Sequence, residues 1–115
     1  MAVHVNRKEL KLMQTVAKKL TEYDPKNPQW MISWAYATRR AESIEAAKRI
    51  LLEAVEQHSQ HALIHYNLAC CECQLGELEV ANARLQHALK IDPGKRAMAL
   101  EDDDLKPLWD EIAGE

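Results

Sequence analysis

The chain has 115 residues, 47% of them hydrophobic, which is enough for one domain or one short repeat array with a modest core. Ala is abundant, Phe is absent, and only three Gly and four Pro occur, so the composition favours helices over the alternating runs of a β-protein. The formal net charge of −3 gives no global reason to expect nucleic acid as a partner.

Charge is unevenly distributed along the sequence. Residues 1–26 hold six basic and three acidic residues, whereas residues 97–115 hold one basic and seven acidic residues. The two ends should therefore attract each other where salt does not screen them. The N-terminus lacks the apolar region of a signal peptide, and no apolar run reaches transmembrane length. We expect a cytoplasmic protein with no membrane partner.

The first helix is predicted over residues 6–23. Asn6 is a good N-cap, and Glu9 stands where it could complete a capping box. Pro25 disfavours the helical state of Asp24, which predicts the end of the helix near residue 23.

The second helix is predicted to begin at Pro28, because the N–H that proline lacks has no partner at the first helical position. Residues 30–37 are apolar nearly all round, which indicates burial on more than one side or a binding face. Ser43 is the predicted N-cap of a third helix that runs through Val55, and a polar linker occupies residues 58–61.

Two further helices are predicted over residues 62–75 and 77–90, with Gly76 as the stop between them. After a weakly helical stretch over residues 95–100, one apolar stripe predicts a helix over residues 104–113, capped by Asp103 or Asp104. The stripe is made of Leu105, Leu108, Trp109 and Ile112, and we expect it to cover the helix over residues 77–90.

The same plan of large and small residues occurs twice, 34 residues apart. Trp34 falls on Leu68, Ala35 on Ala69, Ala47 on Ala81, Leu51 on Leu85 and Ala54 on Ala88, and Pro25, Ser59 and Pro93 follow the same spacing. With this period and pattern, the chain resembles the tetratricopeptide repeat family over most of its length. Met31 and His65 stand where that family usually has tryptophan, and Thr38 and Glu72 where it usually has tyrosine, as in a short divergent member.

The resemblance implies an all-α solenoid of helical hairpins that forms one domain over residues 1–115. It would consist of a half-repeat helix (6–23), repeat 1 (28–59), repeat 2 (62–93) and a C-terminal capping helix (104–113). Neighbouring repeats of such an array bury their apolar faces against one another, and its ends need caps.

The resemblance also implies a non-catalytic function, in which a concave groove binds a peptide or protein segment. Asn67 matches the Asn with which family members often hold a peptide backbone, and Arg39 and Arg40 could bind an acidic partner in a bidentate way. The expected groove residues are Gln29, Ile32, Tyr36, Arg39 and Arg40 from repeat 1, and Leu63, Tyr66, Asn67, Cys70, Cys73 and Gln74 from repeat 2.

Two other functions remain open from the residues. A self-assembling module could use the Trp-rich stretch 30–36 and the opposite charges of the two ends, which would make the chain a homo-oligomer. A metal or redox module could use Cys70 and Cys73, but no second Cys pair completes four ligands, so buried packing is the expected role of these thiols.

No enzyme motif is present in the sequence. There is no Ser-His-Asp arrangement, glycine-rich phosphate loop or HExxH motif. His58, His61 and His65 are spaced like metal ligands, but a predicted helix break separates the first two, which favours a polar linker. We therefore expect no catalytic residues, no cofactor and no metal.

Overall fold

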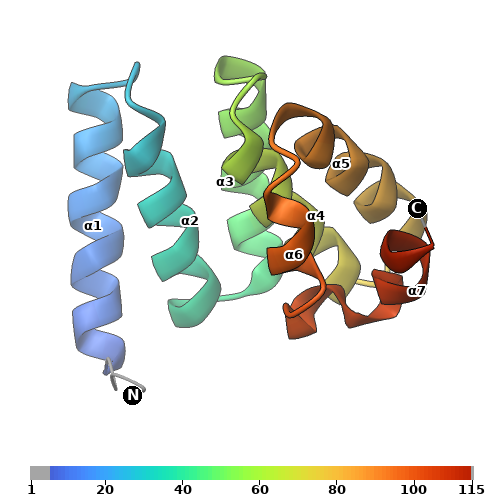
Figure 1. Ribbon diagram of the computed structural model, residues 1–115. Helices are drawn as coiled ribbons and strands as arrows, with labels where there is room; N and C mark the ends of the chain where they lie inside the picture. Colours follow the sequence, from blue (N-terminus) through green and yellow to red (C-terminus); the bar gives the residue numbers. More distant parts are fainter. Residues whose placement is uncertain (1–5, 115) are drawn as a thin grey trace. The chain divides into compact units, whose positions relative to one another are not determined.

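A computed structural model describes residues 6–114 of the chain (Figure 1). These residues form seven α-helices and one 3-10 helix, with no strand among them, which confirms the all-α prediction. The chain divides into two compact units, a first unit up to Ala54 and a second unit from Val55 onward. None of the helices in residues 6–114 combines the length and apolarity that crossing a membrane requires.

The first unit begins with a hairpin of α1 (Arg7–Tyr23) and α2 (Pro28–Ala41), drawn in blue and teal in Figure 1. Asn6 caps α1 as predicted, since its Oδ1 accepts a hydrogen bond from the Glu9 backbone N–H at 2.9 Å. Asn27 caps α2 in the same way, accepting from the Gln29 N–H at 3.0 Å. The two caps and the turn between them fix where each helix of the hairpin begins.

Helix α3 (Ile44–Gln57) follows after a two-residue connection. Ser43 caps it, because its hydroxyl accepts a hydrogen bond from the Ala46 N–H at 3.0 Å. Most of α3 belongs to the first unit, and its last turn begins the second. The buried apolar residues of the first unit are Leu10, Ala17, Met31, Ile32, Ala35, Ala37, Ala41, Ala47, Ile50, Leu51 and Ala54.

The second unit is centred on a hairpin of α4 (Ala62–Gln74) and α5 (Leu78–Ile91). Gly76 has a φ of +83°, a conformation that side-chain-bearing residues rarely adopt, so the predicted stop is confirmed. Its N–H donates to the Cys73 carbonyl at 3.1 Å, and the Glu77 N–H donates to the Glu72 carbonyl at 2.9 Å. This pair of bonds is a Schellman motif, which ends α4 and turns the chain into α5.

The tail differs from the single helix predicted over residues 104–113. It consists of α6 (Lys95–Ala99), the 3-10 helix η1 (Asp103–Leu108) and a short α7 (Trp109–Ala113). The predicted cap is also wrong by at least one residue, because Asp102 accepts from the Asp104 N–H at 3.0 Å. Pro107 lies inside η1, where its missing N–H and its ring interfere with a regular α-helix, so the segment begins as 3-10 helix.

The tail contacts α5, the helix that it was predicted to cover, and it also packs on α4. Helix η1 contacts α4 more extensively than it contacts α5. The predicted apolar stripe does face inward, since its members other than the half-buried Trp109 are buried. The core of the second unit contains Tyr66, Ala69, Cys70, Cys73, Ala81, Leu85, Ala88, Ala99, Leu105, Leu108 and Ile112.

Candidate functional site

Helix α2 exposes a pair of side chains from the predicted groove. Arg40 donates a hydrogen bond from Nη1 to the Tyr36 hydroxyl at 2.7 Å, and its guanidinium lies 5.6 Å from the centre of the Tyr36 ring. Both side chains are exposed, as is Gln29 at the beginning of the same helix. The cation is therefore held in one orientation at the surface, which lowers the entropy cost of binding an anion.

The other two predicted groove residues of α2 are less accessible. Ile32 is buried in the core of the first unit, where it contributes to packing. Arg39 is half-buried, so Arg39 and Arg40 do not form one exposed basic pair. Arg40 with Tyr36 is thus the accessible basic part of the predicted site on α2.

The corresponding face of α4 lies under the tail of the chain. Tyr66, Cys70 and Cys73 are buried there, Leu63 and Asn67 are half-buried, and Gln74 is exposed. The Tyr66 hydroxyl donates to Asp102 Oδ2 at 2.8 Å, and Cys70 Sγ lies 3.7 Å from the same oxygen.

The contact between α4 and the tail also involves the main chain and an apolar side chain of the tail. Gln74 Nε2 donates to the main-chain carbonyl of Asp104 at 3.0 Å, beside the bonds that Asp102 accepts. Leu105, the next residue, is fully buried. This face of α4 therefore binds an acidic segment through its carboxylate, its backbone and one apolar side chain.

The three cysteines are free thiols, and all are buried. Burial raises the pKa of Cys73, and the nearby charges of Asp104 and Asp102 raise it further. Burial, together with the hydrogen bond to Asp102, also raises the pKa of Tyr66. Both groups are therefore protonated at neutral pH, which makes Cys73 a poor nucleophile.

One cluster in residues 6–114 has a spacing that could hold a metal ion. The ligand atoms of Cys70, Asp102 and Asp104 lie within 4.8 Å of one another. Asp102 already accepts hydrogen bonds from Tyr66 Oη and from the Asp104 N–H. Through these bonds, Asp102 attaches the tail to α4 and caps η1.

Sequence reasoning missed an ion pair inside the α4–α5 hairpin. Arg84 donates to both carboxylate oxygens of Glu72, at 2.9 and 3.1 Å, and Glu72 is only 1% exposed. The signal was the one acidic residue of a largely buried helix, at a position where the resemblance leads one to expect tyrosine.

Histidines form a second polar cluster in the second unit. His65 Nε2 lies 2.7 Å from the Ser59 carbonyl oxygen, and the His65 ring is centred 4.3 Å from that of His87. Because a carbonyl only accepts, Nε2 carries the proton and Nδ1 is left as an acceptor. Three buried ring nitrogens have no hydrogen-bond partner among the described residues, namely His58 Nε2, His61 Nδ1 and His65 Nδ1.

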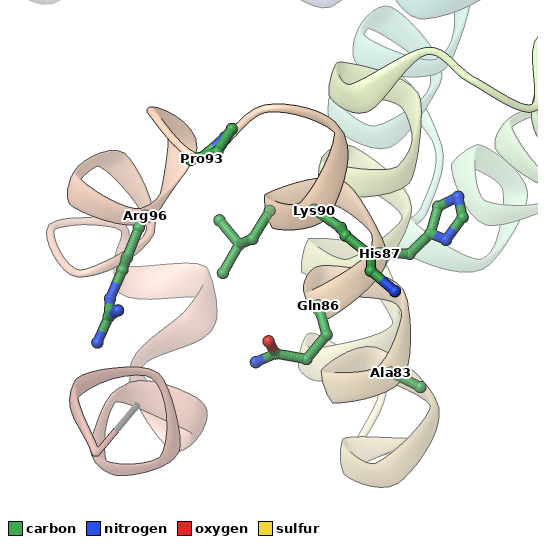
Figure 2. A pocket seen from close by; sticks show the side chains of 7 residues that line it. Ala83, Gln86, His87, Lys90, Pro93 and Arg96 are labelled. Carbon is green, nitrogen blue, oxygen red and sulfur yellow. The ribbon is translucent and has the colours of Figure 1, made fainter.

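A shallow hollow of about 590 Å³ lies between α5 and the start of the tail (Figure 2). Gln86 from α5 and Arg96 from α6 lie on opposite sides of it, and Lys90 adds a second cation. Arg96 Nη2 donates to the Ile112 carbonyl at 2.7 Å, which ties α6 to α7. The arginine thus has a structural role at this hollow.

Comparisons of the chain with family models, with curated proteins and with solved structures gave no match. The class that the fold defines is therefore an all-helical protein built of neighbouring helix pairs.

Proposed function

We propose that the protein is a tetratricopeptide-type binding module that recognises an acidic peptide or protein segment without catalysis. The 34-residue repeat of the sequence supports this reading, because α4 begins 34 residues after α2. The exposed face of α2 with Gln29, Tyr36 and Arg40 would carry the partner.

The observation that carries the proposal is the way α4 binds the tail. Applying the repeat period, Tyr36 corresponds to Cys70 and Arg40 corresponds to Gln74. Cys70 contacts the carboxylate of Asp102, and Gln74 donates to the Asp104 carbonyl. The equivalent positions on α2 are exposed and carry a cation, so they suit an acidic segment supplied by another molecule.

The proposed contact follows from the geometry of the Arg40–Tyr36 pair. A carboxylate of the partner would accept from the Arg40 guanidinium, whose orientation is fixed by Tyr36. The Tyr36 ring would add amphipathic contact area beside it. Recognition of this kind should weaken as ionic strength rises, because the pair is exposed.

A peptide-display selection with the intact chain as bait tests the proposal. We expect enrichment of acidic sequences, and Arg40→Glu should weaken the selected peptides by about tenfold or more. Arg49→Glu is the matched control, since it makes the same charge reversal at an exposed position of α3. Equal affinity of the wild-type chain and Arg40→Glu, or selection of basic peptides, would exclude the proposed face.

Self-association is the second candidate, because Trp30 and Trp34 are half-buried and keep part of their ring surface accessible. Light scattering at increasing concentration separates the two functions. A monomer whose mass does not change with concentration or salt excludes self-assembly.

A further inference from the structure

Helix α1 exposes an apolar row that none of the features above accounts for. Leu12 is 64% exposed, Val16 is 48% exposed and Met13 is 38% exposed. Leu12, Val16 and Leu20 are spaced four residues apart, so they form one ridge of about 12 Å along the helix. A row of this kind marks a contact surface more often than isolated exposed side chains do.

The ridge borders a hollow between α1 and α2. The hollow has a volume of about 330 Å³, and Ser33 is the one polar residue that lines it. Its lining consists of Leu12, Met13, Val16, Ala17, Leu20, Trp30 and Ser33. None of these residues is among those predicted for the peptide groove, so this α1–α2 groove has a different lining, although Ser33 lies one helical turn from Gln29 and Tyr36.

Basic residues flank the apolar ridge. Lys8 lies one helical turn before Leu12, and Lys19 lies three residues after Val16, so both are neighbours of the ridge on the helix surface. Both lysines are exposed. Two acidic residues also lie one turn from the ridge, namely Glu9, which accepts a hydrogen bond from Asn6 Nδ2 at 3.0 Å, and the half-buried Asp24 at the end of the helix. Helix α1 as a whole still carries five basic residues against two acidic ones. The edge of the groove therefore favours an acidic partner.

We propose that the α1–α2 groove binds an amphipathic helix of a partner protein, with acidic residues beside the apolar stripe of that helix. Two antiparallel helices leave a groove into which the side-chain ridge of a third helix fits. The ridge on α1 spans about two helical turns, which matches apolar residues at helical spacing on the partner.

Charge and shape decide between this occupant and two others. A second copy of the chain would bring the same lysines to the contact, and the apolar stripe of its tail is mostly buried. A membrane surface would satisfy the lysines, but it would not fill a hollow lined by Trp30 and Leu20. A partner helix satisfies the apolar hollow and the flanking charge together.

The test uses the intact chain and a display library of amphipathic helices with fixed leucines at helical spacing and randomised flanks. We expect acidic flanks to be enriched. Val16→Asp should then weaken a selected peptide by about tenfold or more. The matched control is Val80→Asp on α5, because Val80 is 47% exposed, close to the value for Val16, and should leave the affinity unchanged.

Several results would overturn the proposal. They are no enrichment, enrichment of basic flanks, equal loss of affinity in the two Val→Asp variants, and Val16-dependent binding to anionic vesicles. Concentration-dependent dimerisation abolished by Val16→Asp would assign the groove to a second copy. Arg40→Glu should not affect the selected helices, which keeps this test distinct from that of the α2 face.

Discussion

At the residue scale, the second unit buries ionisable side chains inside its hairpin of α4 and α5. His65 is 7% exposed, its ring packs at a tilt against that of His87, and its Nε2 donates a hydrogen bond to the Ser59 carbonyl. Glu72 lies about two turns further along α4, where it is buried and paired with Arg84. Burying such groups costs free energy unless they are hydrogen-bonded or paired, so the stability of the second unit depends on their charge states.

We predict that acidification destabilises the second unit through two of its histidines. Burial lowers the pKa of His61, and the charges of His58 and Lys95 lower it further. Burial also lowers the pKa of His65, with His87, Arg84 and His61 acting in the same direction and the bond to Ser59 opposing them.

The unfolded chain therefore binds more protons than the folded chain below the ordinary pKa of 6.5. The contribution of these two histidines to the free energy of unfolding should not change with pH above 6.5. It should fall as the pH decreases from 6.5 toward the lowered pKa values. Chemical denaturation at a series of pH values measures the slope. The double variant His61→Gln with His65→Gln should flatten it, and an unchanged slope would refute the assignment.

The ion pair of α4 and α5 gives a second prediction. Arg84→Ala leaves the Glu72 carboxylate buried without its partner, so it should cost about 3–5 kcal/mol in the free energy of unfolding. Arg49→Ala, which removes an exposed arginine from α3, should change it by less than about 0.5 kcal/mol.

Replacing both members, with Glu72→Leu and Arg84→Met, should recover much of the loss, because no buried charge is left unpaired. Urea unfolding of Glu72→Leu, Arg84→Met and the double variant measures the coupling. Simple additivity of the two single changes would show that the pair does not act as a unit.

At the scale of elements, the caps of α1 and α3 and the end of α4 could be predicted, and the tail could not. Asn6, Ser43 and Gly76 act within three residues of their own positions, so local sequence was sufficient. The tail depends on contacts such as that of Tyr66 with Asp102, which are 36 residues apart. Nothing in the local pattern indicated that α4 would bind it.

The same distinction applies to the candidate site. The resemblance predicted that Cys70 and Gln74 line a groove, and in the structure both contact the acidic tail of the chain. The 34-residue spacing could not predict that this segment is the tail of the chain itself. Nor could it predict the burial of Ile32, since an all-round apolar helix does not show which side faces the core.

Docking of the tail gives a prediction at the element scale. Trp109 is half-buried against the core of the second unit, and its Nε1 donates to the Ala99 carbonyl at 2.8 Å. Trp109→Ala should lower the free energy of unfolding by about 3 kcal/mol. Trp109→Phe, which keeps most of the packing and removes the hydrogen bond, should lower it by about 1 kcal/mol. A negligible change in both variants would show that the tail contributes nothing to stability.

At the scale of the whole molecule, one helix face is covered by the chain itself, and two other surfaces are exposed to solvent. The face of α4 is satisfied by the chain's own acidic tail. The face of α2 presents Arg40 and Tyr36, and the α1–α2 groove presents an apolar ridge between lysines. We therefore infer that partners bind to the first unit, while the second unit shows in its own structure how an acidic segment is held.

Affinity capture from the native host, with quantitative mass spectrometry, tests this account most directly. Three baits are compared, namely the wild-type chain, Arg40→Glu and the control Arg49→Glu. The account predicts that the wild-type chain and Arg49→Glu retain the same partner, with an acidic segment, and that Arg40→Glu loses it. If Arg40→Glu retains every partner that the wild-type chain captures, or if all baits capture only further copies of this chain, the account is contradicted.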